Sequence, residues 1–516
     1  MLTRIRAEED GVAMVVALMV TFVVLMLSLV VMTQSVHSVQ QSGYDRKRLT
    51  AITAAEAGID RMYGYFQNTP ASALTADPVA TPVSVGTYPN TTTYDTTVTY
   101  YGNAFGTLAC GASGSTCGPP APPPAPLFSG TSYPSSAKVV SIGTSSDGTK
   151  RVMETFMVLH PVTAGTNGAI VTNSTTTFSG NFTISGVDSD IYVLCTAQPC
   201  NFLAPSGLES INGSIYVPYG SANIGTNVNI AGQVFARDAV TLNHPQLIVG
   251  GTVSSSTTSV IKTAGTVNGA IHYCSASGGT GPAGAVNDCP SPVPGTADPF
   301  PRLTYDTATW AATQSDGSKW FEVTPAATPV SQCSVAKNLI EAGVTPPAGY
   351  TGVVYNITDP TCVFNNSSNA GTINLNGDLA IVAAGGIHLG NHPTFMGVGG
   401  TRKVVLMAPW PSPSTSSPTC PAQGTTDGPY VVTVDNQVAF DNASTNVLVY
   451  AACAANMSNN NSSFNGQVIA QNATIGNLFS MNYLQMLIPG LGITGFKEDV
   501  SYIREVVCQN PASASC

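Results

Sequence analysis

The chain has 516 residues, of which 43% are hydrophobic and only 9% are charged. This apolar content excludes a disordered protein, and the length leaves room for about two to four domains. The net charge of −10, from 18 basic and 28 acidic residues, argues against nucleic acid as a partner, because phosphate binding needs a basic surface.

The first feature along the chain is an apolar run. Between Gly11 and Tyr44 there is no Asp, Glu, Lys or Arg, and residues 12–32 are almost continuously apolar. At ~1.5 Å per residue this run spans the ~30 Å hydrocarbon core of a bilayer. A secretory signal peptide would be shorter and would end at a small-residue cleavage site. We therefore predict a lipid-spanning helix.

Helical spacing continues beyond the apolar run. Apolar residues recur three or four positions apart from Leu49 to Phe66, and Asn68-Thr69-Pro70 ends the pattern. One long helix over residues 12–67, half inside the membrane and half outside, is the simplest interpretation.

Two segments of this helix carry a family resemblance. They are EEDGVAMVVALMV at residues 8–20 and LTAITAAEAGIDRMY at residues 49–63. They resemble the N-terminal domain of PilX-like minor pilins of type IV pilus systems. The resemblance implies a leader over residues 1–11, cut by a prepilin peptidase between Gly11 and Val12, and other pilin subunits as partners.

Two positions are candidates for subunit packing. Major pilins carry a glutamate five residues after the cut, where this chain has Val16. Some minor subunits lack that glutamate, so the resemblance implies a low-copy or tip subunit. Glu56 lies in an alanine-rich helix and either pairs with a base on a partner or lies on a solvated face with Asp60 and Arg61.

Residues 68–162 alternate in the manner of β-strands. Asp147-Gly148 is flanked by two β-rich runs, which predicts a hairpin turn. A β-meander packed on the helix would complete a pilin-like unit, interrupted by a proline-rich insertion at residues 118–126.

Residues 163–275 contain an internal repeat. Four segments read aliphatic-x-Gly-x-aliphatic around Gly213, Gly232, Gly251 and Gly269. A period near twenty residues with short β-rich runs indicates a β-solenoid. The aliphatic residues that follow each glycine should point inward and stack: Ile215, Val234, Val253 and Ile271.

The repeat stops and then returns. Residues 276–335 are rich in Gly and Pro and indicate a linker or large loop. The motif recurs around Gly377 and Gly466, which predicts a second solenoid part over residues 336–508 and a tail over residues 509–516. The spacing resembles that of bactofilin-like β-helices only generically. The apolar stretch 479–496 is interpreted first as a cap over an open solenoid end and second as a docking segment.

All cysteines lie after the apolar run, which indicates export to an oxidising compartment. Their even number and pairwise clustering predict disulfides between chain neighbours. The expected pairs are Cys110 with Cys117, Cys195 with Cys200, Cys274 with Cys289, Cys333 with Cys362, Cys420 with Cys453, and Cys508 with Cys516.

Other chemistry is weakly indicated. GVGGTRK at residues 397–403 lacks the spacing of a phosphate-binding loop. His388 and His392 stand in strand-and-turn sequence rather than on a helix, and Asp188 and Asp190 have no nearby basic partner. We therefore expect no metal, no cofactor and no enzymatic activity.

The expected fold is mainly β with one long N-terminal α-helix, transmembrane in its first half, and a pilin-like β-meander followed by a disulfide-stapled β-solenoid. The expected function is a minor pilin-like subunit in the cell membrane, with its C-terminal part outside the cytoplasm, working in assembly initiation or surface contact. The alternative is a single-pass surface protein that binds a polymer or host glycan and never enters a filament. A solenoid glycan hydrolase would need converging carboxylates, and few acids are present.

Overall fold

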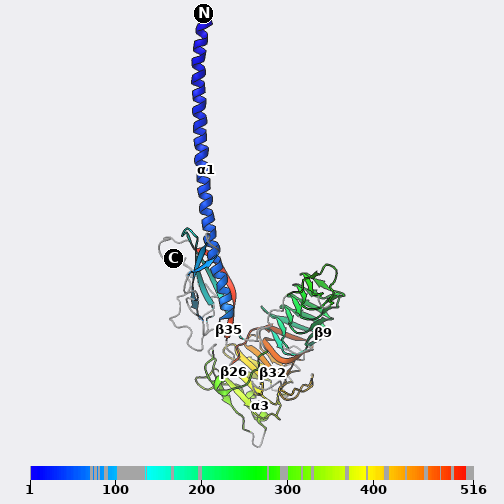
Figure 1. Ribbon diagram of the computed structural model, residues 1–516. Coiled ribbons are helices and arrows are strands. Elements are labelled where there is room, and N and C mark those ends of the chain that lie inside the picture. Colours follow the sequence, from blue (N-terminus) through cyan, green and yellow to red (C-terminus); the bar gives the residue numbers. More distant parts are fainter. Residues whose placement is uncertain are drawn as a thin grey trace. The chain divides into compact units, whose positions relative to one another are not determined.

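The fold is taken from a computed structural model (Figure 1). It describes residues 2–69, 74, 78, 82–85, 91–101, 134, 136–163, 168–195, 200–275, 278–290, 300–314, 318–326, 331–366, 371–390, 393–411, 418–422, 424–435, 438–457, 463–476, 478–489 and 493–506. Side chains are described from residue 14 onward, except at 160–163, 208–209, 493–494 and 497. The chain is mainly β with one long N-terminal helix, as the sequence predicts, and divides into two compact units.

The first unit combines the long helix with an antiparallel sheet. Helix α1 (Leu2–Asn68) is continuous, and its last third packs on strands in the order β1-β2-β3-β4-β35. The β3–β4 turn contains Gly148 at φ +88°, as the predicted Asp-Gly hairpin requires. The strands are β1 (Val83–Val85), β2 (Thr92–Tyr101), β3 (Ser136–Thr144), β4 (Lys150–Thr163) and β35 (Ile493–Val506).

Strand β35 corrects the predicted domain boundaries. The sequence assigned residues 336–508 to the second solenoid part, but β35 belongs to the sheet of the first unit. The chain therefore leaves this sheet after β4 and returns to it in β35, so the solenoid is an insertion between two strands. The alternation of β35 was not recognised because it follows the solenoid repeat without a composition change.

The second unit is a parallel β-solenoid built from three strand ladders. One ladder, here called ladder A, runs through the whole unit. Strands that pair within it are not always consecutive in the sequence. Its order is β22 (Trp320–Val323), β23 (Gly352–Ile357), β26 (Asp378–Ala383), β29 (Arg402–Ala408), β32 (Thr445–Met457), β33 (Ser463–Ile475), β5 (Ile170–Thr172), β8 (Ile191–Val193), β11 (Ile215–Val217), β14 (Val234–Ala236), β17 (Val253–Ser255), β20 (Ile271–Tyr273) and β21 (Val286–Asn287).

The other two ladders complete the coils. Ladder B includes the second halves of β32 and β33 and links them to β24 (Phe364–Asn366), β27 (Ile387–Leu389), β30 (Val432–Val434), β6 (Thr176–Ser179), β9 (Asn201–Ser206), β12 (Ser221–Ile224), β15 (Val240–Leu242) and β18 (Val260–Lys262). Ladder C has two parts. Its first part is a separate three-stranded sheet of β25 (Thr372–Leu375), β28 (Thr394–Gly397) and β31 (Ala439–Phe440). Its second part begins with the first residues of β33 and continues through β34 (Phe479–Tyr483), β7 (Phe182–Ser185), β10 (Leu208–Ile211), β13 (Asn227–Ile230), β16 (Ile248–Val249) and β19 (Thr266–Val267).

The two sequence repeats form one continuous solenoid, with the later piece stacked first. Strand β33 pairs with both β5 and β6, and β34 pairs with β7. Residues 320–483 therefore precede residues 170–287 in the stack. This arrangement places β34 inside the stack, so the prediction that residues 479–496 cap an open end is wrong.

The repeat glycines bring successive coils close together. A Cβ on Gly232 would lie 2.7 Å from the carbonyl oxygen of Gly213, and one on Gly251 would lie 2.8 Å from that of Gly232. The amide of Gly251 also donates to the carbonyl of Gly232 at 2.8 Å. A side chain at these positions would separate the coils, which explains the spacing found in the sequence.

The predicted inward stack is present. Ile215, Val234 and Val253 are partners in register and are fully buried, whereas Ile271 is half-buried because it lies near the end of the stack. Similar aliphatic positions from all three ladders form the core of the unit.

Part of the segment between the two solenoid pieces covers the outer side of the solenoid. Phe300, Leu303 and Trp310 pack on the outer side of ladder A, so residues 300–311 are named the cover segment. The hydroxyl of Tyr450 accepts from the Leu303 amide at 2.9 Å and donates to the Pro301 carbonyl at 3.0 Å. The segment ends in α2 (Thr307–Ala311), which begins after the N-cap Asp306.

A short helix lies at the β22 end of the stack. Helix α3 (Gln332–Glu341) buries Cys333, Ala336 and Ile340 in the solenoid core. It begins after the N-cap Ser331, whose side chain accepts from Ser334. Apolar side chains that would otherwise face solvent at this first coil are thus covered by a helix instead of a further coil.

Candidate functional site

Small residues on α1 allow its close contact with the sheet. A Cβ on Gly58 would lie 2.2 Å from Ser141 Oγ, and one on Gly143 would lie 1.9 Å from the carbonyl oxygen of Ala51. Ala54 and Ala55 are also buried against the strands. The Ala-Ala-Glu-Ala-Gly segment therefore has a packing role, because larger side chains would push the helix off the sheet.

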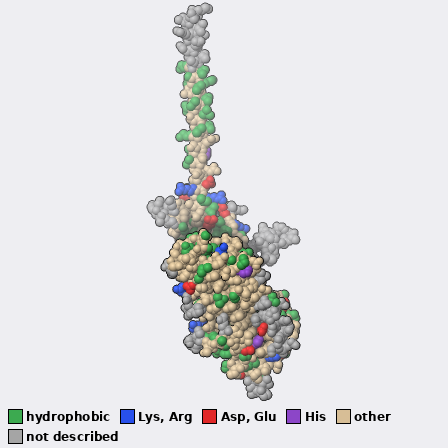
Figure 2. All heavy atoms as spheres, turned by 90° about the vertical axis from the view of Figure 1, so that its right-hand side faces the viewer, with side chains coloured by type: hydrophobic (Ala, Val, Ile, Leu, Met, Phe, Trp, Pro, Cys, Tyr) green, Lys and Arg blue, Asp and Glu red, His purple; other side chains and the backbone are tan. Residues whose placement is uncertain are grey.

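The N-terminal part of α1 has no covering in the first unit. Met14, Leu25 and Met32 are 68%, 62% and 70% exposed, and the apolar side chains between them are exposed as well. Figure 2 shows green side chains along the described part of this helix, up to the blue side chains near its junction with the sheet. Met14–Asn68 is long and apolar enough to cross a membrane.

Ion pairs hold the helix where it meets the sheet. Lys47 Nζ lies 2.9 Å from Asp147 Oδ2 in the β3–β4 turn, and Arg48 Nη2 lies 2.7 Å from Glu505 Oε2 on β35. A hydrogen bond from the Ser145 hydroxyl, followed by that from Lys47, holds the pKa of Asp147 well below its usual value. The β3–β4 turn and the end of β35 are thereby tied to two adjacent residues of the helix.

A second charged cluster ties β35 to the sheet. The Glu154 carboxylate, 6% exposed, accepts from Lys138 Nζ at 2.6 Å, the Tyr502 hydroxyl at 2.8 Å and Arg504 Nη2 at 2.8 Å. Burial alone would raise the pKa of Glu154. The three hydrogen-bond donors lower it by a larger amount, so the pKa of Glu154 lies below its usual value. The cluster was not found from sequence, because its members are far apart along the chain.

The processing and packing candidates have distinct settings. The backbone of α1 is helical at Gly11 and Val12, and the structure does not describe the side chain of Val12. Val16 is 54% exposed on the uncovered part of α1. Glu56 is exposed on the face of α1 opposite the sheet, and it forms no ion pair among the described residues. Gly11, Val12 and Val16 lie within about two turns of α1, whereas Glu56 lies about eleven turns further along the same helix.

Four of the six expected disulfides fall in the described part of the chain. They join Cys195 to Cys200, Cys274 to Cys289, Cys333 to Cys362, and Cys420 to Cys453. The other expected partners, Cys110, Cys117, Cys508 and Cys516, lie outside the described residues, as does the proline-rich insertion at residues 118–126.

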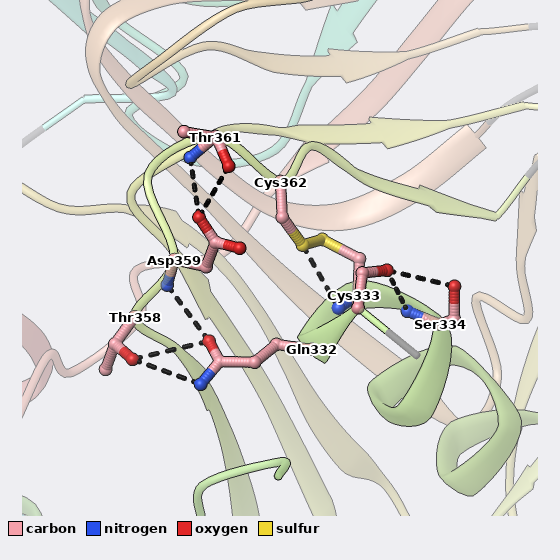
Figure 3. Close-up of a disulfide and its surroundings, with 8 residues drawn as sticks. Gln332, Cys333, Ser334, Thr358, Asp359, Thr361 and Cys362 are labelled. Atoms are coloured by element: carbon pink, nitrogen blue, oxygen red, sulfur yellow. Dashed lines mark hydrogen bonds between the residues drawn. A yellow bond between two sulfur atoms is a disulfide. The ribbon is translucent and has the colours of Figure 1, made fainter. Parts of the chain in front are cut away.

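One disulfide fastens the helix at the solenoid end (Figure 3). The Cys333 amide donates to Cys362 Sγ at 3.0 Å, next to the disulfide itself. The neighbouring Gln332 Oε1 accepts from the Asp359 amide at 2.9 Å, and Asp359 Oδ1 accepts from the Thr361 amide at 2.9 Å. Covalent and hydrogen-bond contacts thus fix the first turn of α3 to the loop before β24.

The remaining polar motifs make local contacts. Asp190 Oδ1 accepts from the Ser214 amide at 2.7 Å, and Asp188 sits in a turn at φ 55°. His388 Nδ1 lies 2.6 Å from Asp427 Oδ1, while His392 is outside the described residues. In the part of the chain that the structure describes, no three His, Cys, Asp or Glu side chains are grouped to hold a metal.

The chain was compared with protein families, curated proteins and solved structures. No family model matches the chain, and no curated protein matches it. Among solved structures, the competence-associated pilin ComZ from Thermus thermophilus is similar at 11% identity and a TM-score of 0.24, over 89% of this chain and 97% of that chain.

Proposed function

We propose that this chain is a pilin-type subunit, held in the membrane by α1 and carrying a β-solenoid outward. The observation that carries the proposal is the division of α1 into two parts. Residues 14–49 expose apolar side chains, whereas Ala51, Ile59 and Phe66 are buried on an antiparallel sheet. An exposed apolar helix of this length requires lipid or other helices around it.

The insertion point of the solenoid supports a terminal position in an assembly. Glu505, at the end of β35, pairs with Arg48, whereas a Cβ on Gly495, near its start, would lie 2.1 Å from the carbonyl oxygen of Gln67. β35 therefore starts beside the last turn of α1 and runs back along it. Chain re-entry at that end, together with Val16 in place of a glutamate, favours a low-copy or tip subunit acting in assembly initiation or surface contact.

The first test is the mature N-terminus. Residues 1–10 include two arginines and three acids, which keep the leader outside the apolar layer, where a prepilin peptidase could reach Gly11. We expect N-terminal sequencing of the membrane fraction to begin at Val12 in a host with the peptidase and at Met1 in a host without it. Gly11→Leu is the matched control and should keep Met1 in both hosts.

A second candidate function is a single-pass surface protein whose solenoid binds a polymer or host glycan. Val16 favours it, because a subunit without the glutamate lacks one means of entering a filament. An intact Met1 on surface-exposed protein in the peptidase host would support this candidate and contradict the pilin-type proposal.

A further inference from the structure

The outer side of ladder C presents two columns of uncharged residues, here named the polar face. The strand registers align the first column across successive coils: Ser463, Ser480, Thr183, Ser210, Asn229, Ile248 and Thr266. The second column starts in the same strands and continues at the residue directly after each later strand: Asn465, Asn482, Ser185, Asn212, Ala231, Gly250 and Asn268. All but three of these residues carry a hydroxyl or a carboxamide, and none is charged.

The polar face is accessible, because its residues alternate with the buried residues of the core. Thr183, Asn229 and Thr266 are exposed, whereas the next residues along their strands, among them Ile184 and Ile230, are buried. Ile248 is 40% exposed and adds an apolar contact in the middle of the first column. The face therefore offers hydrogen-bonding groups together with an apolar surface.

Hydrogen bonds between coils hold side chains of the polar face in place. Asn482 Nδ2 donates to Asn465 Oδ1 at 3.2 Å, and the Ser185 hydroxyl donates to Asn482 Oδ1 at 3.4 Å. At about 4.8 Å between neighbouring strands, the first column is about 29 Å long. A ligand that binds along it meets an array that is already ordered, which lowers the entropy cost of binding.

Charge is excluded from the polar face although the chain carries a net charge of −10. Among the residues between 170 and 290 whose side chains are described, Asp190 lies in the turn before β8 and Arg237 follows β14. Lys262 belongs to the last strand of ladder B. A charged ligand would find no opposite charge in the two columns, so the face suits a neutral one.

We propose that the polar face binds a neutral polysaccharide whose straight, extended chain lies along the stack of coils. Hydroxyl and carboxamide groups both donate and accept hydrogen bonds, as the hydroxyls of sugars require. A polymer repeats the same groups at regular intervals, as the coils do. An anionic polymer is disfavoured by the negative net charge, since neither column supplies a basic side chain.

The inference names a ligand class for the surface contact in the proposed function, and it rests on that function. A single solenoid supplies the whole row of contacts along the polar face. Binding therefore does not require neighbouring copies of this chain, which agrees with a low-copy or tip position.

Retention on insoluble polymers tests the ligand class. The full chain is kept in a detergent without a sugar headgroup and mixed with cellulose or chitin particles, which are neutral, or with alginate beads, which are anionic. We expect retention on at least one neutral polymer, at low and at high salt alike, because no ion pair contributes. Retention on neither neutral polymer, retention on alginate alone, or loss of binding at high salt would overturn the proposal.

A pair of double variants tests the surface. Thr183→Lys with Asn229→Lys places two long, hydrated side chains on the polar face, and we expect at least about tenfold weaker retention. The matched control is Asn223→Lys with Thr241→Lys, at register partners on the outer side of ladder B. It should bind as the unmodified chain does. Equal loss in both double variants, with unchanged thermal unfolding, would contradict binding at the polar face.

Oligomers of the retained polymer test the direction of binding. Affinity should rise with oligomer length up to about 29 Å, the length of the first column, and then level off. Affinity that does not depend on length would contradict binding along the stack. N-terminal sequencing of the same samples reports on processing independently. A processed chain that no polymer retains would leave the pilin-type function standing and remove only this inference.

Discussion

At the residue scale, the buried stack gives the most direct test of the solenoid. Val234 is fully buried and lies in register between Ile215 and Val253. Val234→Asp would place an unpaired carboxylate in this core, and we expect a loss of several kcal/mol in the free energy of unfolding. Asn223→Asp, on the exposed side of β12, is the matched control. Equal thermal stability of the two variants would contradict the stacked-coil interpretation.

The Glu154 cluster predicts a pH dependence at the same scale. Its carboxyl pKa lies below the usual value in the folded unit, so its contribution to stability is complete above the unfolded pKa of about 4.3 and is lost as pH falls through the folded pKa. The protection of β35 amides, relative to their intrinsic exchange rates at each pH, should therefore fall as the pH drops below about 4.3. Glu154→Gln should weaken β35 at neutral pH and remove this dependence. Glu56→Gln, at an exposed acid without an ion pair, should leave the exchange profile unchanged.

At the scale of single elements, α3 depends on its covalent link. The Cys333–Cys362 disulfide closes a span of 29 residues between the helix and the loop before β24. Replacing both cysteines by serine should cost about 2–4 kcal/mol in the free energy of unfolding. Protease sensitivity should rise first within α3, because the helix covers the end of the stack. Unchanged cleavage of α3 would show that Ile340 and Ala336 hold it without the disulfide.

The elements also show what the sequence can predict. The inward stack and the repeat glycines follow from a period near twenty residues, because each coil must repeat the same close backbone approach. The α3 helix was missed because Gln332–Glu341 begins within the segment interpreted as a linker. The Glu154 cluster and the placement of Arg48 beside Glu505 depend on strand order, which no local pattern specifies.

At the scale of the whole molecule, the two solenoid pieces should hold together after the chain is cut. Protease sites introduced at residues 291–299 and 490–492 would separate the pieces in sequence and detach β35 from the second one, so that its pairing with β4 cannot hold them together. β33 still pairs with β5 and β6. We expect both fragments to elute together on size-exclusion chromatography without denaturant. Val468→Asp, at the register partner of Ile170, should weaken this association. Separation of the unmodified fragments after the cut would contradict the continuous stack.

The order of the pieces was beyond sequence analysis for a physical reason. A repeat shows that each coil needs neighbours, but identical coils do not specify which neighbour comes next. The similarity of the segments that begin at Gly232 and Gly466 predicted a shared architecture. It could not show that residues 320–483 stack ahead of residues 170–287.

This inverted stacking order has a kinetic consequence while the chain is being synthesised. Strands β5–β7 are synthesised before β33 and β34, their partners on one side, which are encoded about 300 residues later. At ~5–20 residues per second, synthesis of those partners takes on the order of 15–60 s. During that interval the early coils present an open strand edge, which is prone to wrong pairing. We therefore expect a chaperone that covers this edge during synthesis to raise the yield of native protein.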